Sequence, residues 1–302
     1  MDPLIIVFGL GVGVLIGLTG IGGGSLMTPL LIIFAGIQPT VAIGTDLAYG
    51  AVTKTVGGWR HWRNHTVDFG VCWWLAAGSV PGALVGVWLL DRLHTALGGD
   101  FDQVLLACVA GALMVAALAI LGRVLLSPSS AASEREQVVM TRGRKAAAVG
   151  IGLFLGLILG LTSVGSGALI GPALILVFRL RPHRVVGTDV FHAAVLLWVA
   201  GLAHWVSGNV DFALMGNILI GSIPGVLIGS QLVMRVPAAG LRPVLGCVLL
   251  GSALGVLTKA GVDVPVGAIV GVPVAVGAVA WALARSRRES LPPAVAPTPE
   301  RA

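Results

Sequence analysis

The chain has 302 residues, of which 56% are apolar and only 11% are charged. Ordinary soluble domains carry about 25% charged residues, so this composition excludes a soluble fold. The net charge of +6 and the pI near 10 do not indicate nucleic-acid binding. The 19 Lys and Arg residues fall mainly between apolar runs, where basic residues set the orientation of membrane helices.

The apolar runs predict an all-α integral membrane protein. A bilayer core of about 30 Å needs about 20 apolar residues per helix, and lipid offers no hydrogen-bond partner to other backbone. Because no basic segment precedes the first run, we predict that it is retained and not cleaved. The predicted segments, in chain order, lie near 4–18, 22–37, 43–60, 68–90, 102–123, 146–162, 166–179, 185–206, 211–233, 241–258 and 264–284.

The two halves of the chain repeat each other. The stretch GLTGIGGGSLMTPLL, which starts at Gly17, recurs as GLTSVGSGALIGPAL, which starts at Gly160, an offset of 160 − 17 = 143. Residues 17–86 and 160–229 align without a gap and share about 28 of 70 positions, which indicates a duplication. The predicted domains are a first membrane repeat at 1–126, a cytoplasmic linker at 127–145, a second membrane repeat at 146–260, an additional transmembrane helix at 261–284 and a disordered cytoplasmic tail at 285–302.

The distribution of Lys and Arg predicts the topology. Stretches 4–37 and 146–179 are each either one broken helix or two short helices in a hairpin. If each stretch crosses the membrane once, about 9 Lys and Arg residues lie on one face and about 10 on the other. If each is a hairpin, about 17 lie on one face and only Arg92 and Lys259 on the other, which fits the positive-inside rule. We therefore predict two inverted repeats, each a glycine-broken hairpin plus three transmembrane helices, with the N-terminus outside and the C-terminus cytoplasmic.

The two predicted hairpin turns are candidates for an anion site. Glycine lets the backbone come close to a ligand, and the amides at the start of the next helix favour an anion. The alternative is that these glycines only permit tight turning and close packing. With Lys54, the predicted substrate-binding residues are Thr19, Gly20, Gly22, Gly23, Gly24, Ser25, Thr162, Ser163, Gly165, Ser166 and Gly167.

Lys54 lies near the middle of segment 43–60, and its counterpart in the second half is Leu197. A buried ammonium costs several kcal/mol unless it faces a partner or water. Lys54 therefore either attracts the anion or extends its side chain to the cytoplasmic interface.

Four further residues are candidates for coupling to protons or cations. Asp46 and Asp189 each follow a threonine near the start of a predicted segment, which favours helix capping over coupling. His61 and His204 each precede a tryptophan at a segment end, which favours an interfacial belt over proton transfer. Asp68 and Asp211 are predicted helix caps.

Glycines also recur every fourth residue in two pairs of segments, a spacing that permits close helix packing. These positions are Gly9, Gly13 and Gly17, with Gly152, Gly156 and Gly160, and then Gly78, Gly82 and Gly86, with Gly221, Gly225 and Gly229.

An ordered set of motifs resembles the TauE/SafE family of membrane transporters. The set comprises Gly22 to Gly24, Pro29, Pro39 and Gly44-Thr45, repeated as Gly165 to Gly167, Pro172, Pro182 and Gly187-Thr188, with Asn209-Val210-Asp211 following His204. The resemblance covers both halves and implies transport, with export of sulfite or an organosulfonate. The chain departs from the family pattern at Ser166, and at Asp46 and Asp189, where Ser or Asn is common.

The sequence contains no GxxxxGKS/T phosphate loop, which favours a secondary carrier over a nucleotide-driven pump. We expect no cofactor, no metal and no nucleic acid, and the expected partners are a small anion, membrane lipid and a coupling proton or cation. An intramembrane enzyme needs a cluster of acids, a metal set or a nucleophile pair, and none stands out. An accessory membrane subunit of a larger complex stays open as the alternative.

Overall fold

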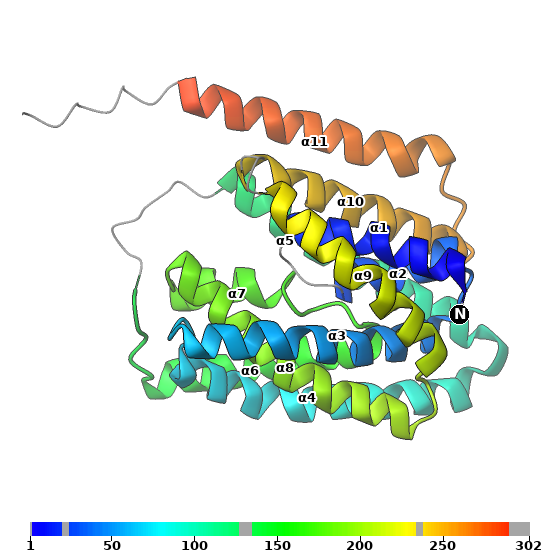
Figure 1. Ribbon diagram of the computed structural model, residues 1–302, viewed down its shortest axis with the longest axis horizontal. Coiled ribbons are helices and arrows are strands. Elements are labelled where there is room, and N and C mark those ends of the chain that lie inside the picture. Colours follow the sequence, from blue (N-terminus) through cyan, green and yellow to red (C-terminus); the bar gives the residue numbers. More distant parts are fainter. Residues whose placement is uncertain (1, 20–23, 127–134, 234–237, 290–302) are drawn as a thin grey trace, which may run out of the picture.

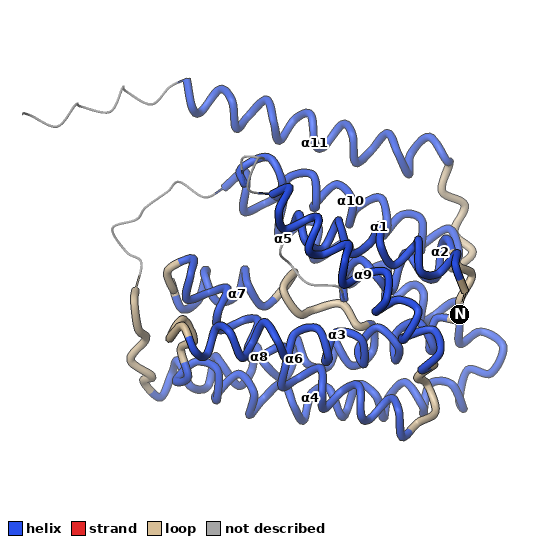
Figure 2. The backbone as a smooth tube through the Cα atoms, in the orientation of Figure 1, coloured by secondary structure: helices blue, strands red, loops and turns tan. Residues whose placement is uncertain are grey.

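The computed structural model describes residues 2–19, 24–126, 135–233 and 238–289. The chain is helical in all four ranges, as predicted (Figure 1 and Figure 2). The helices are α1 (Pro3–Thr19), α2 (Gly24–Phe34), α3 (Pro39–Arg63), α4 (Phe69–Leu97), the 3₁₀ turn η1 (Gly98–Asp100), α5 (Phe101–Leu126), α6 (Arg142–Thr162), α7 (Ile170–Phe178), α8 (Pro182–Val206), α9 (Phe212–Val233), α10 (Ala238–Lys259) and α11 (Val266–Glu289).

Local sequence signals explain where several helices begin. Pro39 and Pro182 take the first position of α3 and α8, where a proline loses no hydrogen bond. The Asp68 carboxylate accepts a hydrogen bond from the Val71 amide at 3.0 Å and caps α4. Asp211 caps α9 through the amide of Leu214 at 2.9 Å, so both predicted caps are confirmed.

Within the described residues, four stretches are long and apolar enough to span a membrane: Phe69–Gly122, which includes α4 and most of α5, then Arg142–Thr162, Pro182–Val206 and Phe212–Leu232. The shorter apolar helices are Pro3–Leu18, Ser25–Phe34, Pro243–Lys259 and Val266–Val279. The fold is therefore that of a multi-pass membrane protein. The predicted disordered tail starts too early, because α11 continues to Glu289.

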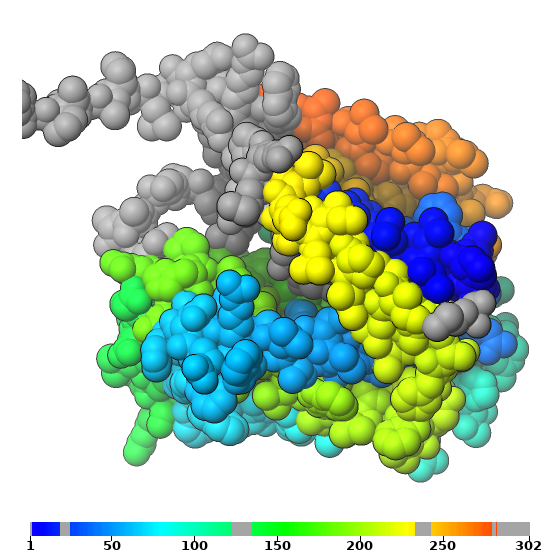
Figure 3. Space-filling model, in the orientation of Figure 1, coloured from blue at the N-terminus to red at the C-terminus, as the bar shows by residue number. Residues whose placement is uncertain are grey.

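Two helix pairs pack through the repeated glycines. In α1, a Cβ at Gly9 would lie 2.9 Å from the Ile218 carbonyl of α9, and Gly13 and Gly17 face α9 in the same way. In α4, Gly78 and Gly82 face the α6 backbone. In both pairs, the residue number of the facing position rises as the number of the glycine rises, so the two helices of each pair run parallel. Figure 3 shows α1, in blue, against α9, in yellow.

Helices α3 and α8 pack side by side and run antiparallel. Ala48 near the start of α3 lies against Gly201 near the end of α8, whereas Gly58 near the end of α3 lies against Phe191 in the first half of α8. The Trp198 indole Nε1 of α8 donates a hydrogen bond to the Thr55 hydroxyl of α3 at 2.8 Å. These two helices form the centre in which the buried polar side chains lie.

Candidate functional site

Asp46 lies inside α3 and is fully buried. Its Oδ2 accepts hydrogen bonds from the Thr28 hydroxyl of α2 and from the Ser163 hydroxyl, each at 2.6 Å. Ser163 ends α6 with a φ of 61°, which turns the chain back towards α3. The carboxylate of Asp46 therefore joins the first half of the chain to the hairpin turn of the second half.

Asp189 occupies the corresponding position of α8 and is also buried. The backbone of Gly167 lies beside its carboxylate. Gly167 has a φ of 86°, a conformation that L side chains rarely adopt, so the turn requires glycine here. The prediction that Asp46 and Asp189 cap helices is wrong, because the helices begin about two turns earlier, at prolines.

Lys54 lies two turns beyond Asp46 in α3, and only 7% of its surface is exposed. Its Nζ is buried and has no hydrogen-bond partner in the part of the chain that the structure describes. The ammonium interacts electrostatically with the carboxylates of Asp189 and Asp46. The burial of Lys54 and of its Nζ argues against the alternative in which this side chain extends to the cytoplasmic interface.

Other buried polar atoms around these helices also lack partners. The hydroxyls of Ser25, at the start of α2, and Ser166, in the turn before α7, are fully buried and unpartnered within the described ranges. One carboxylate oxygen of each aspartate, Oδ1 of Asp46 and Oδ1 of Asp189, is unpartnered as well. Since buried polar groups are almost always hydrogen-bonded, these atoms mark the strongest candidate site in the described chain.

Sequence reasoning missed His192, which the structure adds to this group. Its Nε2 lies 2.8 Å from the Ser79 hydroxyl of α4, while its Nδ1 is buried without a partner in the described residues. The side chain interacts electrostatically with Lys54. The available signal was the helical spacing, because residue 192 follows Asp189 by three positions and lies on the same side of α8.

The two histidines named from the sequence are not part of this group. His204 is fully buried and its Nε2 lies 2.9 Å from the Gly160 carbonyl, so the belt prediction is wrong for this residue. His61 lies in the last turn of α3, where its Nδ1 is 2.9 Å from the Thr66 hydroxyl. Trp205, next to His204, is 55% exposed and does suit a belt.

The hairpin turn of the second half is described more fully than that of the first. Gly20, Gly22 and Gly23 lie outside the described residues, and Thr19 and Gly24 end α1 and begin α2. The two remaining residues of the second turn have local roles. The Thr162 hydroxyl donates to the Ile158 carbonyl at 2.6 Å, which occupies its proton, and Gly165 packs on Leu159.

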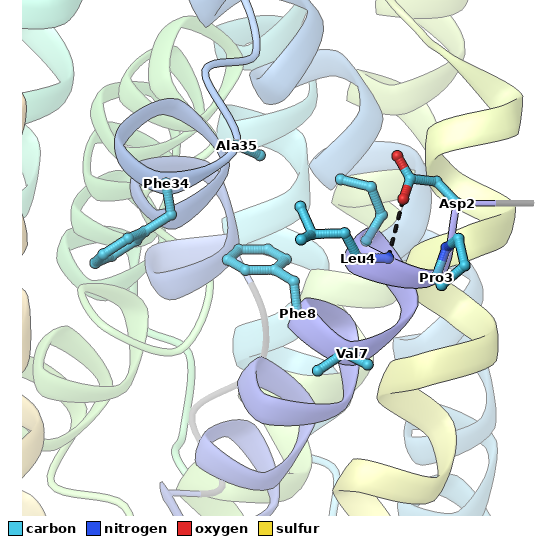
Figure 4. A pocket seen from close by; sticks show the side chains of 8 residues that line it. Asp2, Pro3, Leu4, Val7, Phe8, Phe34 and Ala35 are labelled. Carbon is cyan, nitrogen blue, oxygen red and sulfur yellow. Dashed lines mark hydrogen bonds between the residues drawn. The ribbon is translucent and has the colours of Figure 1, made fainter.

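A separate groove lies at the start of α1 and the end of α2 (Figure 4). Its volume is about 710 Å³, and its lining is almost entirely apolar. The Asp2 carboxylate, its one charged group, accepts a hydrogen bond from the Leu4 amide at 2.9 Å. None of the buried polar residues lines this groove, and no group of three or more His, Cys, Asp or Glu in the described chain could hold a metal ion.

Comparison with known proteins matches residues 5–256 to the family described as "Sulfite exporter TauE/SafE". The probable membrane transporter protein YjnA of Bacillus subtilis (strain 168) is 39% identical over 254 residues, which cover 84% of this chain and 99% of YjnA. A probable membrane transporter protein of Xylella fastidiosa (strain 9a5c) is 30% identical over 267 residues, which cover 86% of this chain and 97% of the relative. No solved structure matches.

Proposed function

Because the chain belongs to the TauE/SafE family of membrane transporters, we propose that it is a secondary transporter of a small anion and exports sulfite or an organosulfonate across the cytoplasmic membrane. The substrate follows from the family description and from the buried cation at the centre of the fold. A protein of this kind is not an enzyme and needs no cofactor. Its cycle consists of binding, a conformational change and release.

The observation that carries this proposal is the unpartnered Lys54 ammonium. A buried charge costs several kcal/mol unless it is paired and hydrogen-bonded, and the Nζ of Lys54 has no hydrogen bond within the described chain. An anion beside this nitrogen supplies the missing acceptor. The hydroxyls of Ser25 and Ser166, which are also unpartnered, are donors that a sulfite or sulfonate oxygen accepts from.

The hairpins add further donors to the proposed site. Helix α2 begins at Gly24 and α7 begins at Ile170, directly after the two glycine turns. The first amides of a helix have no partner within it and carry a partial positive charge. The start of α2 is the stronger candidate, because the Ile170 amide of α7 already donates to the Gly165 carbonyl at 3.3 Å. Together with Lys54, the start of α2 favours an anion beside α3.

We further propose that the two halves are inverted repeats. The support comes from α3 and α8, which are counterparts at the offset of 143 and run antiparallel. Contacts also occur in equivalent pairs: the Asp68 amide donates to the Thr188 hydroxyl at 2.9 Å, and the Asp211 amide donates to the Thr45 hydroxyl at 3.0 Å. In this arrangement residues 1–126 and 146–260 form the two repeats, as predicted from the sequence.

The orientation is also a proposal, with the N-terminus outside and the C-terminus in the cytoplasm. In Figure 1 the start of α1 and the end of α11 lie at opposite ends of the helices, which agrees with this topology. Thiol labelling of a cysteine-free protein tests it. A cysteine at the exposed Asp263 should label from outside intact cells, and one at the exposed Gln137 only after permeabilisation; the reverse result contradicts the orientation.

Transport by purified protein tests the substrate. Proteoliposomes that contain the wild type should release labelled sulfite or methanesulfonate, and Lys54→Met should slow release at least about tenfold, which is the rate cost of about 1.4 kcal/mol. Lys259→Met is the matched control, because Lys259 is exposed at the end of α10. If folded wild-type protein moves neither anion, the proposed substrate class is wrong.

A further inference from the structure

The charges around Lys54 set a condition on any anion that binds there. The group contains one cation, Lys54, and two carboxylates, Asp46 and Asp189, all buried. With all three ionised, the site carries a net charge of −1 before any substrate arrives. Because uncompensated buried charge is costly, the empty site is stable when one carboxyl group holds a proton and the other neutralises Lys54.

Binding of a monoanion disturbs this balance. The anion takes over the role of countercharge to Lys54, and the ionised carboxylate becomes the uncompensated charge. The balance returns when that carboxylate also takes a proton. We infer that the site binds one proton with each monoanion and that the protein is an electroneutral anion–proton symporter; this inference rests on the proposed function.

The geometry provides a place for each proton. Oδ1 of Asp46 and Oδ1 of Asp189 are buried and unpartnered in the described chain, so each is free to carry a hydrogen and to donate it to a bound oxyanion. Oδ2 of Asp46 accepts from Thr28 and Ser163, which stabilises the ionised form in the empty site. Asp189 has no side-chain donor of this kind among the described residues, and it therefore holds the proton first.

The surroundings contain few other groups that could take this role. On α3, Tyr49 lies one turn after Asp46 and interacts electrostatically with it, and on α8 His192 interacts electrostatically with Lys54. Cys72 of α4 is buried but interacts with Asp68 at the start of its own helix. The described residues of α2 and α7 carry no ionisable side chain, so the two aspartates are the groups through which the charge is balanced.

The equilibrium distribution of methanesulfonate across proteoliposomes tests the stoichiometry, because this sulfonate is a monoanion throughout the working pH range. Electroneutral symport predicts a tenfold accumulation for each pH unit of imposed gradient, and no response to a valinomycin-clamped potential. A uniported anion responds instead to potential, by about 50-fold per 100 mV, which is 2.3 kcal/mol converted to a ratio. Lumenal pH, read with a trapped dye, should change by one proton per anion.

Replacement of the carboxyl groups gives a second readout. The double variant Asp46→Asn/Asp189→Asn has no group left to take the proton, so transport should become driven by potential and independent of pH. Each single variant retains one titrating carboxyl group and should keep one proton per anion. Asp263→Asn, at an exposed loop position, is the matched control and should behave as the wild type.

The outcomes separate the two proposals. If the wild type moves no anion, the proposed function fails. If the wild type moves methanesulfonate but responds to potential, to sodium or without proton uptake, the function stands and the symport inference is wrong. Should the double variant not fold, the measurements on the wild type alone decide.

Discussion

The two hydroxyl groups that bind Asp46 allow a quantitative test of the buried site. Thr28→Val keeps the shape of the side chain but removes the donor that lies 2.6 Å from Oδ2. Ser163→Ala removes the second donor, also at 2.6 Å. Hydrogen bonds to an ionised group contribute about 1.5–3 kcal/mol each, and both partners are buried here, so neither loss is compensated by water.

Thermal unfolding in detergent measures this effect. A loss of about 1 kcal/mol lowers Tm by about 2–4 °C in chains of 150–250 residues, so each variant should melt at least about 3 °C lower than the wild type. The double variant should lose more than the sum of the single losses, because it removes both hydroxyl donors from Oδ2 of a buried carboxylate. Thr258→Val is the control, since that exposed hydroxyl donates only to Leu254 in its own helix.

Repeating Thr28→Val in an Asp46→Asn background completes a double-mutant cycle. With a neutral acceptor, the cost of Thr28→Val should fall to about 0.5–1.5 kcal/mol, the usual range for uncharged hydrogen bonds. If Thr28→Val is as harmless as Thr258→Val, or if its cost is the same with Asp46 and with Asn, then Asp46 is not an ionised carboxylate held by these hydroxyls.

Two further predictions concern helix packing and the linker between the two halves. Gly152→Val should destabilise the protein by about 1–3 kcal/mol or prevent helix assembly, because its Cβ would meet the α4 backbone. Gly150→Val is the control and should be tolerated, since Gly150 faces open space on the same helix. Equal melting temperatures for the two variants would contradict this prediction. Glu136 has a lowered pKa, first because His183 hydrogen-bonds to it. Its stabilising contribution is therefore present above the unfolded pKa near 4.5 and is lost as the pH falls through the folded pKa, so the Tm difference between wild type and Glu136→Gln should vanish in acid.

Much of the fold was predictable because apolar length and glycine spacing are local properties of the sequence. Each predicted segment corresponds to a helix, and the glycines predicted to pack do face another backbone. The starts of α3 and α8 were placed too late, because Gly-Thr-Asp was taken as a helix start. The prolines five residues before these triplets were the better signal, since a proline fits the first turn of a helix without loss.

The polar site was predictable only in part. Lys54 was identifiable because a lysine within an apolar segment is costly wherever it points. Thr28 and Ser79 were not, because single polar residues in apolar runs reveal their partners only when helices far apart in sequence come together. His192 could have been found from its helical spacing to Asp189. The pairing of Asp46 with Ser163 joins residues 117 positions apart, which no periodicity encodes.

The described chain contains one buried charged group of this kind because its two halves differ at the position of the lysine. The surrounding backbone contacts do occur in both halves, since the hydroxyls of Thr45 and Thr188 accept hydrogen bonds from equivalent backbone amides. The charged group does not, since Lys54 corresponds to Leu197, which packs on Gly50. In the proposed cycle, a second lysine at that position would neutralise both carboxylates of the empty site, so neither would hold a proton before the anion binds. With a single lysine, one aspartate is protonated before the anion arrives, and the other takes up the proton that accompanies the anion.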